Sequence, residues 1–206
     1  MSVLLQTQLE HVAATIAQRL DTLKVDYAMM GGAAVCLMAP DPQHATEDVD
    51  LVIRVDHRSI TADLLKNKLL TSFPSDFAPV SQFGHNIPGY KLRLPGGASW
   101  PNRPQYDLQT AARVTQNING YQVKSFSAEW IIREKIRSQY QRHGAKQAVD
   151  LQDVENLLSY AIPGKSELDF DDDQKLQDAL ATLLKRKPKL RGDLKEAFQC
   201  QAVFGN

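Results

Sequence analysis

The sequence predicts a mixed α/β fold with α+β character, in which a sheet-forming core over residues 1–125 precedes a helical C-terminal region over residues 126–206. Three observations support this. Apolar residues recur at helical spacing at the N-terminus, β-branched and aromatic segments then alternate with Gly, Pro and Asn, and helical spacing dominates after Ser127. We therefore expect a mixed-sheet core with the helical region packed on it.

The composition is that of an ordinary globular protein. The chain has 206 residues, of which 43% are hydrophobic, and its 24 basic and 24 acidic residues cancel. Global charge therefore favours neither a nucleic acid nor a membrane surface as partner. The two cysteines, Cys36 and Cys200, form neither a disulfide framework nor a zinc pattern. We expect a cytoplasmic protein, since the N-terminus lacks the features of a signal peptide and no apolar run reaches the ~20 residues that span a membrane.

The N-terminal elements follow one another closely. Leucine, valine and isoleucine at three- and four-residue spacing predict an amphipathic helix over residues 2–23. Val25–Met30 reads as a short buried strand. Gly31 and Gly32 then predict a turn, followed by a short helix that ends near Pro40.

The next elements are a strand over Glu47–Val55 and a helix over residues 57–73, with Ser59 as its N-cap. The region from residue 74 to residue 120 is rich in Pro, Gly and Asn. Within and after it the alternating patterns predict three strands, Tyr90–Leu94, Gln105–Thr110 and Tyr121–Ser125, the last entered through an Asn119-Gly120 turn. From Ser127 onward four helices are predicted, over residues 128–142, 145–161, 171–187 and 192–203.

Two carboxylates on the Glu47–Val55 strand are the feature with the most chemical content. Because strand side chains alternate, Asp48 and Asp50 share one face with Val52, while Val49, Leu51 and Ile53 form the face to bury. Two ionised carboxylates at that spacing repel each other unless a cation lies between them, and hard oxygen ligands suit Mg²⁺ or Mn²⁺. Asp107, on the Gln105–Thr110 strand, is the candidate for a third ligand. The alternative is an acidic pair exposed on the protein surface.

The double glycine upstream supports the metal interpretation. Gly31 and Gly32 follow a strand and open a helix, where they allow a phosphate to approach the backbone and point N–H groups at it. The alternative is an ordinary tight turn.

In combination these residues resemble the nucleotidyltransferase fold of the DNA polymerase β superfamily, and most closely its minimal AbiEii-type toxin members. Those members carry Gly-Gly-x-Ala followed by Thr-x-Asp-x-Asp-Leu. The matching positions here are Gly31, Gly32, Ala34, Thr46, Asp48, Asp50 and Leu51. A second likeness lies in the helical region, at Lys135, Arg142, Lys146, Asp150 and Asp153.

The resemblance implies a Mg²⁺-dependent transfer of a nucleoside monophosphate from a nucleoside triphosphate to an RNA or protein hydroxyl. Asp48, Asp50 and Asp107 would hold the metal and carry catalysis, while Gly31, Gly32, Thr46 and Lys135 would bind the nucleotide. Ala33 replaces a hydroxyl residue found in many members, and the Asp107 segment is unusually polar. These departures motivate an alternative, a protein that binds nucleotide or a partner without transfer.

Two basic segments have competing interpretations. The cations from Lys135 to Lys146 either face the triphosphate or an RNA acceptor, or stabilise a helix C-terminus. The Lys185–Lys189 segment is either a nuclear import signal or a helix end followed by a linker. The acids from Asp169 to Asp173 resemble a calcium loop but lack its glycine and its final glutamate, so we expect them to cap the next helix.

Overall fold

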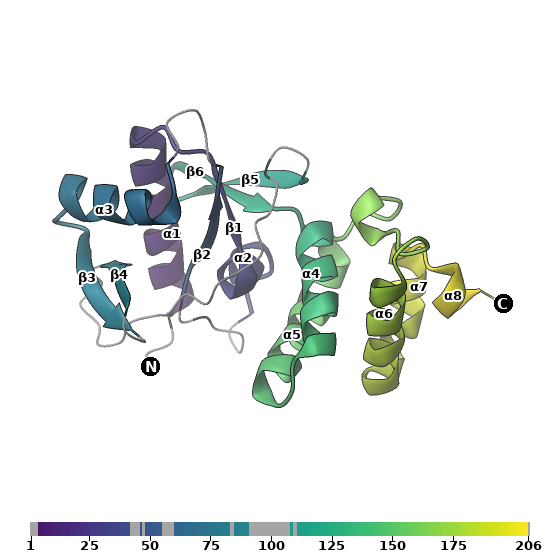
Figure 1. Cartoon of the computed structure of the whole chain (residues 1–206). Helices are drawn as coiled ribbons and strands as arrows, with labels where there is room; N and C mark the ends of the chain where they lie inside the picture. The colour runs from purple at the N-terminus through teal and green to yellow at the C-terminus, as the bar shows by residue number, and fades with distance from the viewer. Residues whose placement is uncertain are drawn as a thin grey trace. The chain divides into compact units, whose positions relative to one another are not determined.

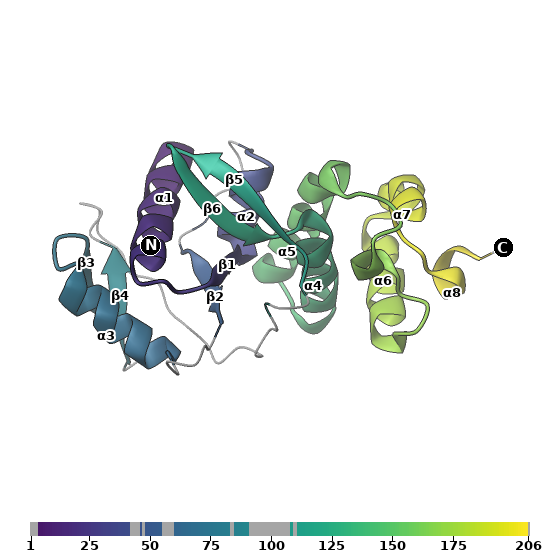
Figure 2. The ribbon, with the colours of Figure 1, turned by 90° about the horizontal axis from the view of Figure 1, so that it is seen from above.

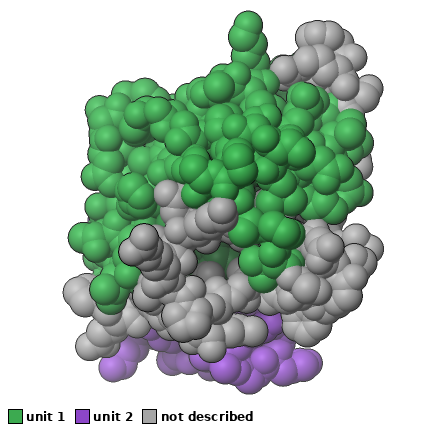
Figure 3. Space-filling view, turned by 90° about the vertical axis from the view of Figure 1, so that its left-hand side faces the viewer, with its two compact units in different colours: residues 1–126 green, residues 127–206 purple. Residues whose placement is uncertain are grey.

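The computed structural model describes residues 4–41, 46, 48–54, 60–82, 85–90, 108 and 111–205, with the backbone alone described at residues 81, 82 and 85–90. The chain divides into two compact units, Met1–Phe126 and Ser127–Asn206, which Figure 3 draws in green and purple. The first unit holds the named strands, and the second is built from helices.

Four strands form a mixed sheet in the first unit, in the order β2-β1-β6-β5 (Figure 1). Their bounds are Tyr27–Met30 for β1, Asp50–Ile53 for β2, Arg113–Ile118 for β5 and Tyr121–Phe126 for β6. β1 is antiparallel to β2 and parallel to β6, and β5 and β6 are antiparallel. The expected mixed α/β fold is therefore confirmed.

The turn between β5 and β6 has the predicted chemistry. Asn119 and Gly120 have φ values of 51° and 84°. A two-residue hairpin turn of the primed type requires positive φ at both positions, and Asn-Gly is its favoured sequence. The strand that this turn joins to β6, Arg113–Ile118, was not predicted, because its polar residues mask the alternation that marks a strand.

Helices α1 (Gln6–Thr22) and α2 (Gly31–Met38) cover one face of the sheet (Figure 2). The Gln18 Nε2 atom of α1 donates to the Tyr121 hydroxyl at 2.7 Å, and Gln116 Nε2 donates to the Leu37 carbonyl of α2 at 3.4 Å. Tyr121 and Gln116 share a face, since Gln116 pairs with Val123 and alternate residues face the same side. The apolar stripe of α1 is buried as its spacing predicts; its members are Leu9, Val12, Ala13, Ile16, Ala17 and Leu20.

A hairpin and a helix complete the first unit. β3 (Phe77–Gln82) and β4 (His85–Tyr90) pair as a separate two-stranded sheet, and α3 (Ala62–Ser72) packs against both. Sequence reasoning missed this hairpin, because Pro79, Pro88 and Gly89 are residues that ordinarily argue against a strand.

The predicted cap of α3 is wrong. Thr61, not Ser59, is the N-cap, and its hydroxyl accepts from the Leu64 N–H at 3.3 Å. Ile60, which precedes the cap, is buried in the core, and the helix begins after it. Most of the predicted Tyr90–Leu94 strand and all of Gln105–Thr110 except Leu108 lie outside the described residues.

The second unit is a helical assembly in which α4 packs against α5 and α6. Ser127 and Asp173 cap α4 and α6, so the prediction that the acidic segment caps a helix is confirmed at Asp173. Trp130, on α4, is a buried core residue. The helices of this unit are α4 (Ala128–Gln141), α5 (Ala145–Leu157), α6 (Gln174–Arg186), α7 (Arg191–Ala197) and α8 (Gln201–Phe204).

The helix predicted over residues 192–203 is two helices, α7 and α8. Phe198 and Cys200 are both buried in the extended break between them, and the Asp171 carboxylate accepts from the Gln201 N–H at 2.6 Å. The Lys185–Lys189 segment spans the end of α6 and a 3-10 turn, where Lys187 pairs with Glu155 at 2.7 Å. Across the described residues, none of the helices combines the length and apolar character needed to cross a bilayer.

Candidate functional site

The double glycine and the second carboxylate meet at the end of β1. Met30, the last residue of β1, pairs with Asp50, the first residue of β2. Gly31 follows with φ of 70° and begins α2. A Cβ atom at Gly31 would overlap the Asp50 Oδ2 atom and lie 3.2 Å from its Cγ atom. The Asp50 carboxylate therefore lies directly over the Gly31 backbone, in space that only glycine leaves open.

Gly32 makes the same kind of contact with a different side chain. A Cβ atom there would lie 3.0 Å from the Thr46 hydroxyl. That hydroxyl donates to the Asp48 carbonyl at 3.0 Å and lies 3.4 Å from Asp48 Oδ1. The four residues Gly31, Gly32, Thr46 and Asp50, together with Asp48, form one cluster, which we call the glycine–aspartate site.

The N-terminus of the chain holds this site in place. The Leu4 N–H donates to the Thr46 carbonyl at 2.9 Å, in an isolated antiparallel bridge. Sequence reasoning did not connect Leu4 with the site. Leu4 and Thr46 are far apart along the chain, and nothing in either segment signals the bridge.

Burial on β2 differs from the predicted pattern. Asp50 is 8% exposed, whereas Leu51, Val52 and Ile53 are only partly buried. The expectation that Val49, Leu51 and Ile53 form the buried face is wrong. β2 is an edge strand of the described sheet. Asp50 is the most buried residue of β2 because its side chain fills the space over Gly31. Asp48 precedes β2, so the two carboxylates do not share the face of one regular strand as predicted.

The backbone at the glycines suits an anion. α2 begins at Gly31, and its N-cap Met30 makes no side-chain capping hydrogen bond. The first N–H groups of a helix have no partner within the helix, and the positive end of the helix dipole lies there. The N–H groups of such a turn commonly donate hydrogen bonds to phosphate oxygens.

The donor set of the glycine–aspartate site fits a hard divalent cation. The Asp50 carboxylate lies at Gly31 and the Thr46 hydroxyl lies at Gly32 and contacts Asp48, and Mg²⁺ is commonly bound through one or two carboxylates with substrate phosphates completing its shell. Among the described residues no group of three or more His, Cys, Asp or Glu side chains could hold a metal. Asp107, the predicted third ligand, lies outside the described residues.

Lys135, predicted to bind nucleotide, belongs to a buried ionic cluster of the second unit. Its ammonium lies 3.0 Å from Asp150 Oδ1 and also pairs with Asp153. Arg142 Nη1 lies 3.0 Å from Asp150 Oδ2. Burial lowers the pKa of Lys135, but attraction to Asp153 and Asp150 outweighs it and raises the pKa above its usual range. Lys135 therefore neutralises two carboxylates that are 0–1% exposed.

Comparison with known proteins relates the chain to a solved structure. None of the family models matches the chain, and neither does any of the curated proteins. Among solved structures, the chain is similar to the crystal structure of an antigenic nucleotidyltransferase-like protein from Paracoccidioides brasiliensis. The two are 56% identical over 100% of each chain, with a TM-score of 0.90. The chain therefore has a nucleotidyltransferase fold and belongs to the same family as that nucleotidyltransferase-like protein.

Proposed function

We propose that the protein is a Mg²⁺-dependent nucleotidyltransferase that moves a nucleoside monophosphate from a nucleoside triphosphate to an RNA or protein hydroxyl. One observation carries the proposal. The Asp50 carboxylate lies over the Gly31 backbone, and the Thr46 hydroxyl, which lies beside Gly32, donates to Asp48. Two candidate metal ligands are therefore adjacent to the backbone that we expect to bind phosphate. If Asp48 and Asp50 were merely solvent-exposed surface residues, the fold would not require Gly31 and Gly32 beside them.

Each residue has a role in this proposal. The N–H groups at Gly31 and Gly32 hold the β- and γ-phosphates, and Asp48 and Asp50 supply oxygen ligands to the metal, completed by Asp107. The metal, when bound, supplies the positive charge that neutralises the triphosphate and lowers the pKa of the acceptor hydroxyl. Positioning and charge neutralisation are the main needs of phosphoryl chemistry, so this chain's task is to orient the groups.

Thr46 positions Asp48 in this scheme, because its hydroxyl donates to the Asp48 carbonyl, and nucleotide binding by Thr46 stays a prediction. Nucleotide binding by Lys135 stays a prediction, and its two buried carboxylate partners favour a structural role. Membership of the AbiEii-type group also stays a proposal. It rests on the Gly-Gly-x-Ala and Thr-x-Asp-x-Asp-Leu residues of this sequence.

A thermal-shift panel tests the proposal. The four ribonucleoside triphosphates are compared with and without Mg²⁺, in the unaltered protein and in the Asp48→Asn, Asp50→Asn double variant. A ligand at a hundred times its dissociation constant stabilises by about 2.7 kcal/mol, or roughly 5–10 °C for a chain of this length. The matched control is Asp63→Asn, since that carboxylate is exposed and pairs only weakly with Lys66, at 3.4 Å.

A Mg²⁺-dependent shift that vanishes in the double variant and persists in Asp63→Asn supports nucleotide binding at the glycine–aspartate site. Release of labelled pyrophosphate with RNA or protein acceptors then separates transfer from the alternative, nucleotide binding without transfer. That alternative draws on Ala33, which is fully buried in α2 and offers no hydroxyl to a phosphate. If no triphosphate shifts the melting temperature at millimolar concentration, the proposal fails.

A further inference from the structure

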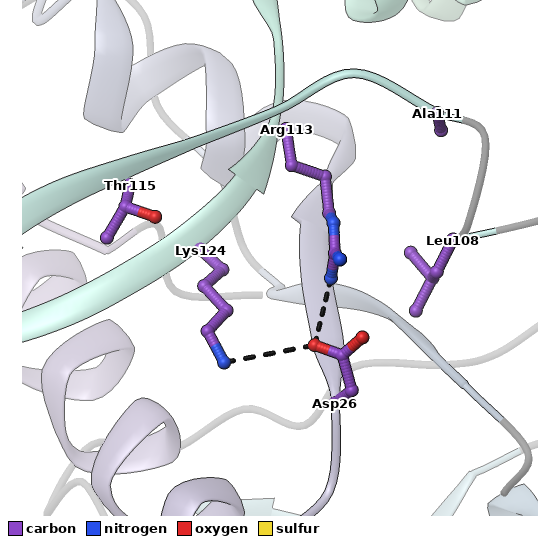
Figure 4. Close-up of a pocket in the computed structure, with 6 residues that line it drawn as sticks. All are labelled: Asp26, Leu108, Ala111, Arg113, Thr115 and Lys124. Atoms are coloured by element: carbon purple, nitrogen blue, oxygen red, sulfur yellow. Dashed lines mark hydrogen bonds and ion pairs between the residues drawn. The ribbon is translucent and has the colours of Figure 1, made fainter.

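A cavity opens in the first unit at the other end of β1 from the glycines. It has a volume of about 480 Å³ and is lined by Asp26, Leu108, Ala111, Arg113, Thr115 and Lys124 (Figure 4). Arg113 comes from β5, Lys124 from β6, and Asp26 directly precedes β1. Sequence reasoning could not find this site, since its members come from three segments without a shared motif.

The cavity lies beyond the point at which β1 pairs with β6. Among the described residues, β1 and β6 pair at one position, where Met29 lies opposite Ser125. Two residues before that pair, the Tyr27 hydroxyl accepts from the Lys124 N–H at 3.3 Å, so a side chain occupies the place of a strand acceptor. The Lys124 ammonium lies 5.4 Å from the centre of the Tyr27 ring. The buried Tyr27 side chain therefore lies next to β6 at this end of β1, and the side chains of Asp26, Arg113 and Lys124 line the cavity beside it.

One carboxylate oxygen lies between the two cations of the cavity. Asp26 Oδ1 accepts from Arg113 Nη1 at 2.9 Å and lies 3.8 Å from Lys124 Nζ, as the dashed lines in Figure 4 mark. Lys124 Nζ is also 3.7 Å from Asp21 Oδ1. Both distances from Lys124 exceed hydrogen-bonding length, so these carboxylates attract its ammonium without satisfying its three donors.

The Asp26 contacts are weak enough for a ligand to replace. The side chains of Arg113, Asp26 and Lys124 are 30–34% exposed, and ion pairs this accessible to water contribute little to stability. A guanidinium and an ammonium that converge on one oxygen present the geometry with which proteins bind phosphate. The Thr115 hydroxyl, opposite Lys124 in the strand register, adds a neutral donor.

The cavity shares a sheet face with Asp50. Lys124 and Thr115 form a cross-strand pair, and alternation places their Cβ atoms on the face opposite Gln116 and Tyr121, while the Lys124 ammonium extends to Asp21 at the end of α1. Because Met29 pairs with Ser125, Met30 lies on the Lys124 face, and Asp50 lies there as the partner of Met30. Asp26 and Met30 are four residues apart in sequence, which is about 13 Å along an extended strand.

We propose that Arg113 and Lys124 bind a phosphate group of the second substrate, the acceptor, and that Asp26 is an internal counter-ion which this phosphate displaces. The assignment to the acceptor rests on the proposed transfer reaction. Phosphate bound at Arg113 and Lys124 would anchor the acceptor about 13 Å along the sheet face from the carboxylates that carry the reaction. Phosphate can come from a nucleic-acid strand or from a small phosphorylated molecule, and both present the same oxyanion.

The test is a titration followed by amide chemical shifts, with EDTA present and in the Asp48→Asn, Asp50→Asn background. Inorganic phosphate is compared with chloride at equal ionic strength. We expect phosphate to shift the signals of Thr115, Lys124 and their neighbours. Arg113→Gln and Lys124→Gln should abolish the response, and Lys124→Arg should retain it. Asp26→Asn should strengthen binding by about two- to fivefold, since it removes a partly exposed ion pair that competes with the ligand.

Asp26→Asn is the decisive variant, because a purely structural role predicts that all three neutral variants behave alike. Lys66→Gln and Asp63→Asn serve as controls that remove one partner of an exposed pair in the same unit. The subsite is disproved if phosphate shifts no signals in the cavity, or if Asp26→Asn leaves the affinity unchanged or lower. Because metal and triphosphate are absent here, this result does not depend on the transfer reaction.

Two further arms test the assignment to the acceptor. Saturating Mg²⁺ and triphosphate, added to the protein with its carboxylates intact, should leave phosphate binding at Lys124 unchanged. Displacement would instead make the cavity part of the triphosphate site and overturn the assignment. A short oligoribonucleotide is then compared with a nucleoside monophosphate at equal phosphate concentration. Tighter binding of the oligoribonucleotide identifies the RNA acceptor as the source of the phosphate, whereas equal binding identifies a site for small phosphorylated molecules and overturns the assignment to the acceptor.

Discussion

Polar side chains of the glycine–aspartate site occupy space that is open because Gly31 and Gly32 have no Cβ atom. Asp50 can approach the backbone because Gly31 has no Cβ atom, and Gly32 leaves room for the Thr46 hydroxyl that donates to Asp48. The double glycine therefore does more than turn the chain. It makes room for two polar side chains in a part of the unit where Ala33 and Ala34 are fully buried.

Gly31→Ala should destabilise the first unit and abolish Mg²⁺-dependent nucleotide binding. The substitution forces an alanine into the left-handed region, which costs about 1–2 kcal/mol, and also moves the Asp50 carboxylate. Gly120→Ala is the matched control, because its φ of 84° is similar and no atom lies within 4 Å of the new Cβ. Urea unfolding and thermal shifts measure the two effects. Equal losses in both variants would contradict the proposed overlap with Asp50.

Thr46→Val should weaken Mg²⁺-dependent nucleotide binding, whereas Thr46→Ser should preserve it. Valine keeps the volume but removes the donor that holds Asp48, a loss of about 1 kcal/mol or roughly a fivefold change in affinity. Titration with Mg²⁺ and triphosphate measures this. Similar affinities for the valine and serine variants would show that the hydroxyl does not position Asp48.

At the scale of elements, α4 and α5 are joined by charge as well as by apolar packing. Lys135 of α4 contacts Asp150 and Asp153 of α5, and both carboxylates are buried. A buried pair contributes little net stability when complete, but removing one partner leaves charge in a medium of low dielectric constant. The helices are consequently sensitive to a single substitution at Lys135.

Lys135→Met should destabilise the second unit by about 3–5 kcal/mol, because it removes the ammonium beside the buried Asp153, while Asp150 keeps its ion pair with Arg142. Lys146→Met, at an exposed position of α5, is the control and should change the free energy of unfolding little. Circular dichroism against urea measures both. A folded Lys135→Met variant of unchanged stability that binds triphosphate poorly would instead favour the nucleotide-binding role predicted for Lys135.

At the scale of the whole molecule, both units carry a group whose pKa is raised. Burial raises the pKa of Tyr27 in the first unit to about 12, opposed by its hydrogen bond from Lys124 and assisted by the charges of Asp21 and Asp26. In the second unit the carboxylates beside Lys135 hold its pKa above the usual range despite its burial. In each case the folded protein keeps its proton to higher pH than the unfolded chain does.

The free energy of unfolding should therefore fall as pH rises above about 10, the ordinary tyrosine pKa, because the unfolded chain loses these protons first. The stability that the raised pKa values contribute is fully present below that pH and is lost through about pH 12 for Tyr27. Urea midpoints at increasing pH measure the decline, and Tyr27→Phe should make it shallower. An unchanged slope in that variant would exclude Tyr27 as a cause.

The sequence by itself determined the fold class, the amphipathic α1, the Asn119-Gly120 turn and the association of a double glycine with two aspartates. The first three follow from short-range periodicity and turn chemistry, which depend on neighbouring residues alone, and the last follows from the resemblance of the motif residues to a known family. Only the tertiary structure decided that Asp50 is buried over Gly31, that Thr46 holds Asp48, that Lys135 neutralises two buried carboxylates and that Asp26, Arg113 and Lys124 share a cavity. Such placements join distant segments, and strand register and side-chain packing create them only when the whole unit folds.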